Sequence, residues 1–228
     1  MSRATLPGIV FDLDGTLIES APAIMAVGNR LLSENGLPPL TLEETRSYIG
    51  NGAAKFVERA FSARGVRAAK ERLHAAFERF KVLYGEADPL DNAPMPGVDQ
   101  ALRTLADEGF PLALCTNKPD IPTRTIIAAR GWSDLLTAIV SGDSLDVKKP
   151  DPGPLFEARR LLGTSSILFV GDSEIDAETA LRADVPFILY TNGYRKAPIE
   201  TLSFRASFAD FADLAEVVRS VMADGLVR

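Results

Sequence analysis

The second half of the chain alternates apolar runs with amphipathic stretches, and this alternation restricts the possible fold more than any other feature. Each apolar run has the length and composition of a buried strand, and each amphipathic stretch has the spacing of a helix with one apolar face. After Pro96 they read, in order, GVDQALRTLADEG, FPLALCTN, IPTRTIIAARG, AIVSGD, DPGPLFEARRLLG, SSILFVGDS, EIDAETALRAD and VPFILYTNG. Helices that alternate with strands in this way predict an α/β fold, a doubly wound Rossmann-like parallel sheet.

A further strand is predicted near the start, in the stretch IVFDLDGTLIE at residues 9–19. Its first three residues form a continuous apolar run, which suits a strand buried on both faces of a parallel sheet. Asp12 and Asp14 follow directly. An Asp-Gly pair is also ordinary turn chemistry, so this stretch alone does not distinguish a turn from a reactive site.

Between this strand and the alternating region lies a long segment with helical periodicity and almost no strand signal. It contains APAIMAVGNRLLSENG, TLEETRSYIG, AAKFVERAFSARG and RAAKERLHAAFERFKVLYG. A single crossover between strands needs only one helix and short loops. We therefore expect a discontinuous α/β core, residues 1–17 and 94–228, with an inserted helical domain at 18–93. Its exits, DGTLIES and ADPLDNAPMPG, read as loops that act either as hinges or as rigid connections.

Composition excludes several classes of protein. With 228 residues, 46% hydrophobic and 25% charged, the chain has the makeup of an ordinary globular protein. A net charge of −6 without a dense basic block argues against a nucleic-acid partner. The sequence shows neither a secretory signal nor a membrane span, and its single cysteine excludes an internal disulfide, so we expect a cytoplasmic protein.

The scarcity of histidine and cysteine limits the chemistry further. The only histidine, His74, lies in a helical stretch away from any nucleophile elbow, and we expect it on a helix surface. Cys115 lies in an apolar strand, where a small buried packing residue is expected. Carboxylates are therefore the candidates for proton transfer, and a histidine-based zinc site is not expected.

Polar and charged residues follow several predicted strands at the point where each strand ends. Ligands of open α/β sheets bind at the carboxyl ends of the strands, near the switch in strand order, so we expect these residues to meet at one place. They are Asp12 and Asp14, Thr116 and Asn117, Asp143 with Lys148 and Lys149, and Asp172 with Asp176.

The ordered set DLDGT, TNK, KKPDP and GDSEID resembles the motifs of the haloacid dehalogenase superfamily, in its phosphatase branch. The helical insert stands where that superfamily has its cap domain, and the resemblance covers essentially the whole chain. Within the superfamily the chain is most similar to proteobacterial phosphoglycolate phosphatases, on YIGNGAAKFVERAF, CTNKP, GDSEIDAETA and GYRK. The resemblance implies hydrolysis of a small phosphorylated metabolite, 2-phosphoglycolate, to glycolate and phosphate.

The resemblance also implies roles for the acidic residues. Asp12 is the implied nucleophile, forming an aspartyl-phosphate, and Asp14 the implied acid and base. The implied cofactor is Mg²⁺, held by the Asp12 carboxylate, the backbone carbonyl of Asp14 and the Asp172 carboxylate, with Asp176 in or beside that set. GDSEID also reads as a helix start, because Asp and Ser cap helices well, and both interpretations can hold together.

The implied phosphate-binding residues are Thr116, Asn117 and Lys149. Thr116 and the loop after it offer a hydroxyl and backbone amides, although a strand end and a turn explain these residue types equally well. Lys149 precedes Pro150, as the phosphate-neutralising lysine of the superfamily does. The neighbouring Lys148 stays an alternative.

For substrate choice we expect Gly50, Asn51 and Gly52 of the insert to approach the reactive site, with Lys55 or Arg46 available for a substrate carboxylate. A Gly-Asn-Gly between helices is otherwise simply a turn. Outside the insert, Arg195 and Lys196 either bind a partner or are solvated. Trp132 marks either an interface or the core. The sequence leaves a monomer and a homodimer open.

Other functions fit less well. Twelve residues counted from Asp12 end at Ala23, where an EF-hand needs a bidentate glutamate, and no Gly-rich nucleotide-binding motif occurs. A phosphatase for another small phosphate ester and a β-phosphoglucomutase-like phosphomutase remain the enzymatic alternatives. A non-catalytic phosphoacceptor or binding module resembling a receiver domain would leave the insert unexplained.

Overall fold

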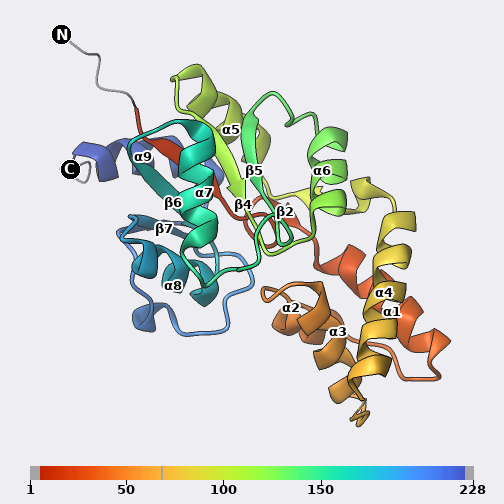
Figure 1. Ribbon diagram of the computed structural model, residues 1–228. Helices are drawn as coiled ribbons and strands as arrows, with labels where there is room; N and C mark the ends of the chain where they lie inside the picture. The colour runs from red at the N-terminus through yellow and green to blue at the C-terminus, as the bar shows by residue number, and fades with distance from the viewer. Residues whose placement is uncertain (1–5, 68, 224–228) are drawn as a thin grey trace.

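The computed structural model describes residues 6–67 and 69–223, and its centre is a six-stranded parallel sheet (Figure 1). The strand order is β5-β4-β1-β6-β7-β8, with every neighbouring pair parallel. The strands are β1 Gly8–Phe11, β4 Leu112–Cys115, β5 Leu136–Val140, β6 Ile167–Gly171, β7 Phe187–Tyr190 and β8 Ala206–Phe208. The expected doubly wound α/β fold is confirmed.

Strand β1 occupies the middle of the sheet because its apolar run is buried on both faces. It pairs with β4 on one side and with β6 on the other. The chain builds outward from β1 through β4 to β5, and then returns to add β6, β7 and β8 on the opposite side. The strand order therefore reverses at the carboxyl end of β1, which is where such sheets bind ligands.

Helices cover both faces of the sheet, and alternate side chains of each strand decide which face they meet. On one face Ile9 and Phe11 pack in the same apolar cluster as α5 (Val98–Asp107), α6 (Asp120–Ala129) and α9 (Leu214–Ala223). On the other face Val10 packs with α7 (Gly153–Leu162) and α8 (Glu174–Ala183). Short 3₁₀ turns lie at Pro89–Asp91, Ile199–Thr201 and Phe211–Asp213. Among the helices of the described residues, none is long and apolar enough to cross a membrane.

Four helices of the insert gather at one end of the sheet (Figure 1). They are α1 Ala21–Glu34, α2 Leu42–Tyr48, α3 Ala53–Ser62 and α4 Lys70–Glu86. Their apolar faces form a cluster separate from the two clusters of the sheet, and its buried members include Leu31, Phe56, Phe61 and Phe80. Tyr194, which follows β7, also packs into this cluster, so the insert is built partly on a side chain of the core.

The connections between insert and core are more regular than the sequence predicts. Ile18–Glu19 (β2) and Ala93–Pro94 (β3) pair as a two-stranded antiparallel ribbon, where we expected two irregular loops. Strands of two residues are too short to give a periodic signal. Strand β8 and helix α9, near the carboxyl end, were also not predicted.

The structure shows where Trp132, His74 and Cys115 lie, and so tests what the sequence predicts for each. Trp132 is fully buried in the core and its indole N–H donates to Asp99 Oδ1 at 2.7 Å, so it packs the core and does not mark an interface. His74 is exposed on α4, as expected. Cys115 is fully buried in β4, also as expected.

We predict that the Cys115 thiol reacts with a thiol-specific dye only when the chain unfolds. Burial raises the pKa of this thiol to about 12, so the folded protein keeps it protonated and unreactive through pH 10. Labelling at pH 8 should be immediate in urea and slow in buffer. Native labelling should stay slow at pH 10 as well, because the buried thiol is mostly protonated there and a dye reaches it only through unfolding. Rapid stoichiometric labelling of the native protein would contradict the burial of β4.

Candidate active site

A cavity of about 300 Å³ lies between the carboxyl ends of the sheet strands and the helical insert. It collects residues that are far apart in the sequence and that come from both parts of the chain. From the core it is lined by Asp12, Asp14, Thr116, Asn117, Lys118, Lys149, Asp172 and Asp176, and from the insert by Gly50, Gly52, Phe56, Phe80 and Tyr84. The meeting of strand ends that the sequence predicts is therefore present.

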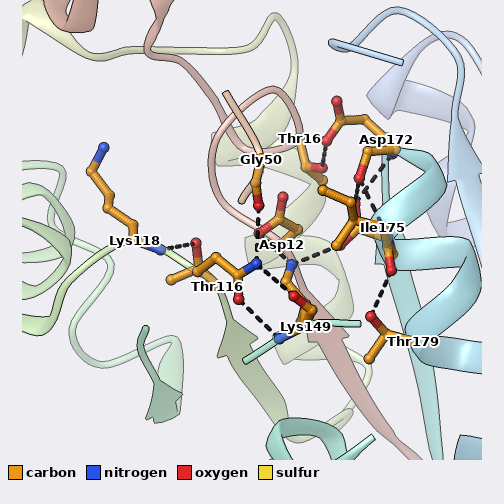
Figure 2. A network of polar contacts seen from close by, with 12 residues as sticks. Asp12, Thr16, Gly50, Thr116, Lys118, Lys149, Asp172, Ile175 and Thr179 are labelled. Carbon is orange, nitrogen blue, oxygen red and sulfur yellow. Dashed lines mark hydrogen bonds and ion pairs between the residues drawn. The ribbon is translucent and has the colours of Figure 1, made fainter. Parts of the chain in front are cut away.

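A buried lysine joins two of the carboxylates. Asp12 directly follows β1, and its backbone N–H donates to the Val170 carbonyl of β6 at 2.9 Å. The Nζ of Lys149 donates to Asp12 Oδ1 at 2.7 Å and to Asp176 Oδ1 at 2.6 Å. Figure 2 shows Lys149 beside Asp12, with Thr116 and Lys118 on one side of Asp12 and Asp172 and Thr16 on the other. This ammonium is charged, because the two carboxylates raise its pKa against the opposing effect of burial.

Asp172 is held at the end of β6 by two donors. The Thr16 hydroxyl donates to its Oδ1 at 2.7 Å and the Tyr194 backbone N–H to its Oδ2 at 2.5 Å. Gly15 makes this approach possible, since its φ of +88° suits glycine and a Cβ there would lie 2.6 Å from Asp172 Oδ2. The Asp-Gly turn and the polar cluster that the sequence offered as alternatives thus occur together.

Asp176 lies in the first turn of α8 and takes part in a capping box with Ser173. Its Oδ2 accepts from the Ser173 hydroxyl at 2.6 Å, while its Oδ1 accepts from Lys149. Gly171 leaves room for it, because a Cβ at that position would meet Asp176 at 2.6 Å. Asp176 therefore caps the helix and faces the cavity at the same time.

The carboxylates of Asp12, Asp172 and Asp176 form a group suited to a divalent cation. All three are buried, and one oxygen from each lies within 4.8 Å of the others. Burial, aided by repulsion from Asp176, raises the pKa of Asp12 to about 7 against the effect of Lys149. Burial, with repulsion from Asp176 and Asp12, raises the pKa of Asp172. Lys149 alone does not balance these charges, and an oxygen-rich set of this kind is what hard divalent metals bind.

Thr116 and Asn117 lie in the loop after β4 and mainly organise its backbone. The Thr116 hydroxyl accepts from the Lys118 backbone N–H at 3.2 Å. Asn117 exchanges two hydrogen bonds of 3.0 Å with the backbone of Lys149, and its Nδ2 also donates to the Gly50 carbonyl of the insert. Asn117 thus joins three segments of the cavity wall, a role that a two-residue motif does not reveal.

The structure separates the two adjacent lysines that the sequence left open. Lys149 is buried against Asp12, whereas Lys148 is exposed. Asp143 lies at the mouth of the cavity and is exposed. Its Oδ1 accepts from the Asp120 backbone N–H at 2.8 Å and from the Ser141 hydroxyl at 3.1 Å, so it supports the start of α6.

Lys118 is a residue of the cavity that the sequence analysis did not single out. Its Nζ donates to Asp14 Oδ1 at 2.9 Å and to the Tyr84 hydroxyl of α4 at 2.7 Å. Burial opposes its charge, yet Asp14 and Tyr84 outweigh that effect and raise the pKa of Lys118. In the sequence, only its place in the TNK motif distinguishes Lys118 from a surface lysine. The contact with Tyr84 could not be predicted, because the tertiary fold alone brings the two residues together.

The residues expected for substrate choice divide into two groups. Gly50 and Gly52 line the cavity. Asn51 accepts from Arg59 at 2.7 Å, and Lys55 is half exposed on α3 and paired with Glu58 at 2.8 Å. Neither of these two side chains lines the cavity in the described part of the chain.

Two further positively charged side chains lie near the junction of insert and core. Arg46 pairs with Glu19 of the β2–β3 ribbon at 2.8 Å. Lys196, from the loop after β7, lines the cavity and donates from Nζ to the Ile49 carbonyl at 3.0 Å. The Lys196 side chain is therefore bound across the junction in this structure.

Comparison with known proteins agrees with this geometry. Residues 9–190 match the model of the haloacid dehalogenase-like hydrolases. A phosphoglycolate phosphatase from Cereibacter sphaeroides is 44% identical over 219 residues, and the match covers 96% of this chain and 100% of that protein. One from Rhodobacter capsulatus is 42% identical over 212 residues, covering 93% of this chain and 96% of that protein. The crystal structure of a predicted phosphoglycolate phosphatase from Haemophilus somnus superimposes with a TM-score of 0.86 at 31% identity, covering 95% of this chain and 99% of that one. The resemblance that the motifs indicated is confirmed.

We predict that Lys149→Met lowers the free energy of unfolding by about 3 kcal/mol in metal-free buffer, because it leaves buried carboxylates without their cation. Urea unfolding followed by Trp132 fluorescence measures this loss. Added Mg²⁺ should restore part of the stability, since a divalent cation would offset the same charges. Lys148→Met is the matched control, and its exposed position predicts a change within about 0.5 kcal/mol. Equal stability of the two variants without metal would show that Lys149 does not balance this cluster.

Proposed function

Since the chain belongs to the haloacid dehalogenase-like hydrolases and is a phosphatase that resembles phosphoglycolate phosphatases, we propose that it converts 2-phosphoglycolate to glycolate and phosphate. The observation that carries this proposal is the joining of Asp12, Asp14, Lys149 and Asp172 in one cavity at the strand ends. The extent of the similarity, which covers nearly all of this chain and of the relatives, supports the choice of substrate.

We further propose that residues 18–93 act as a cap over a core formed by 1–17 and 94–228. The separate apolar cluster of α1–α4 and the β2–β3 ribbon at the junction support this division. The insert also supplies one wall of the cavity. A cap in this position would limit the access of water and of large esters to Asp12.

In the proposed complex, Thr116 and the backbone amides of its loop donate to the phosphoryl oxygens, and Lys149 offsets their negative charge. Asn117 holds these two segments at a fixed separation through its bonds to the Lys149 backbone. Mg²⁺ held by the Asp12 and Asp172 carboxylates and the Asp14 backbone carbonyl, with Asp176 beside it, would reduce the repulsion between carboxylate and phosphate. The buried carboxylate cluster described above supports this assignment.

The first chemical step transfers the phosphoryl group to the protein. An oxygen of the Asp12 carboxylate attacks phosphorus and forms a new P–O bond while the ester P–O bond breaks. The departing glycolate oxygen takes a proton from the Asp14 carboxyl group. Asp14 lies two residues after Asp12 and lines the same cavity, which supports this pairing of roles.

The second step returns the protein to its starting state. Asp14, now ionised, takes a proton from a water molecule as that water attacks phosphorus. The bond between phosphorus and the Asp12 oxygen breaks, and phosphate leaves with the oxygen of the water. One carboxyl group thus serves as acid and then as base, so each cycle ends with its proton restored.

Phosphate release from a panel of esters tests the proposal. With Mg²⁺, we expect the value of kcat/KM for 2-phosphoglycolate to exceed the values for β-glucose 1-phosphate, pyrophosphate and an aryl phosphate by at least about tenfold, as differential transition-state binding requires. Asp12→Asn should lower kcat by on the order of 10⁴-fold or more, because it removes the nucleophile. EDTA should abolish turnover of the wild type. Turnover of β-glucose 1-phosphate to glucose 6-phosphate would favour the phosphomutase instead. Full activity of Asp12→Asn would exclude Asp12 as the nucleophile.

A second prediction concerns the intermediate. An aryl phosphate has a leaving group that departs without protonation, whereas hydrolysis of the phosphoenzyme still needs a base. Asp14→Asn should therefore release about one equivalent of phenol in a rapid burst and then stall, because the phosphoryl group stays on Asp12. Mass spectrometry of the quenched protein should place one phosphoryl group on the peptide that contains Asp12. Steady turnover without a burst, or a phosphoryl group elsewhere, would argue against this mechanism.

A further inference from the structure

We propose that Lys118, positioned by Tyr84 of α4, binds the carboxylate of the substrate and so determines the preference for phosphate esters with an anionic tail. This inference rests on the proposed function, since it assigns the part of the same cavity that would recognise the glycolate end of 2-phosphoglycolate. It assigns a binding role to a residue pair that joins core and insert.

Lys118 has the position and a hydrogen-bonding donor for such a contact. Its side chain is 5% exposed and lines the cavity. An ammonium carries three N–H donors. Among the described residues, Nζ uses two of them, toward Asp14 Oδ1 at 2.9 Å and the Tyr84 hydroxyl at 2.7 Å. A third donor is left for a ligand in the cavity.

The structure of the substrate places its carboxylate close to this donor. In 2-phosphoglycolate only two covalent bonds separate the ester oxygen from the carboxylate carbon. In the proposed reaction Asp14 contacts that ester oxygen, and Lys118 is hydrogen-bonded to Asp14. A carboxylate that is two bonds from an atom touching Asp14 therefore lies within reach of the Lys118 ammonium.

The negative charges of the cavity require a cation where the substrate carboxylate is expected to bind. The substrate carboxylate would enter a space that already contains Asp12, Asp14, Asp172 and Asp176, so it would be repelled without a compensating charge. A charged hydrogen bond to a desolvated ammonium provides both the attraction and the direction. An ester with a neutral tail gains less from this contact, because it has no charge to pair with the ammonium.

The other lysines that line the cavity are engaged elsewhere. Lys149 is held between Asp12 and Asp176, where the phosphoryl group is expected. Lys81 pairs with Glu78 at 2.7 Å and is about half exposed. Lys196 donates to the Ile49 carbonyl and is the one rival for the carboxylate. Among the lining residues that the structure describes, Lys118 alone combines burial, a contact with Asp14 and a remaining donor.

Tyr84 gives the insert a part in this recognition. Its hydroxyl accepts from Lys118 and donates to Asn92 Oδ1 at 3.1 Å, and its ring lies 4.7 Å from the Lys118 ammonium. Both contacts fix the lysine side chain in one direction. Because Tyr84 belongs to α4, the carboxylate site is complete only when the insert is docked as it is here.

The test compares two substrates that differ only at the tail: 2-phosphoglycolate and 2-hydroxyethyl phosphate, which has a neutral hydroxymethyl group in place of the carboxylate. We expect Lys118→Met to lower kcat/KM for 2-phosphoglycolate about 10- to 100-fold more than for the neutral ester, the effect expected for a lost charged hydrogen bond. Lys196→Met is the matched comparison and should affect both esters alike. Thermal unfolding with and without Mg²⁺ checks that each variant is folded.

A second variant keeps the proposal testable if Lys118→Met does not fold. Tyr84→Phe retains the ring and removes only the hydroxyl, and it should raise KM for 2-phosphoglycolate by about 3- to 10-fold while leaving KM for the neutral ester nearly unchanged. Equal losses for both esters in the Lys118 and Tyr84 variants would overturn the inference, because they would mean that the pair only positions Asp14. A selective loss in Lys196→Met alone would overturn it in favour of Lys196. A wild-type protein with no preference between the two esters would instead overturn the substrate assignment itself, together with the inference that rests on it.

Discussion

The contact on which the cavity depends is the buried ammonium of Lys149 between Asp12 and Asp176. Taking two carboxylates out of water costs several kcal/mol each, and a well-placed cation with hydrogen bonds to both is the means by which a fold tolerates that cost. Asp172 adds a third negative charge within the same group. The cluster therefore remains rich in negative charge, which attracts a divalent cation. Such a cation, together with the Lys149 ammonium, would in turn offset the charge of a phosphoryl group that the carboxylates alone would repel.

The backbone determines how closely these charges approach one another. Asp12 and Asp172 follow adjacent parallel strands, β1 and β6, so their positions are set by the register of the sheet. Glycines at positions 15 and 171 allow side chains to pack directly against the main chain, where a Cβ would collide. Asn117 then binds the backbone of Lys149 and the carbonyl of Gly50, so that the loop after β4, the loop after β5 and the insert form one continuous wall.

Two of the links between the helical insert and the core reach acidic residues of the cavity, and their chemistry differs. At one side Tyr84 meets Lys118, and the pair places a positive charge next to Asp14. At the other side the Tyr194 hydroxyl donates to Glu19 at 2.5 Å and accepts from the Ala21 backbone N–H, while its own N–H donates to Asp172. The position of the insert is thereby coupled to two of the acidic residues, one on each side of the cavity.

The sequence by itself determined the parallel sheet, the helical insert and the acidic residues at the strand ends, because each depends on a local pattern. Periodicity identifies a strand or a helix, and the order of strands and crossovers limits the topology. Very short elements such as β2 and β3 gave no such pattern. Only the tertiary structure decided that Lys149 and not Lys148 is buried against Asp12, that Lys118 meets Tyr84, and that Lys55 pairs with Glu58 and does not line the cavity. Adjacent or similar lysines are equivalent in a sequence, and they differ only once the fold places one of them in a low-dielectric interior beside a carboxylate.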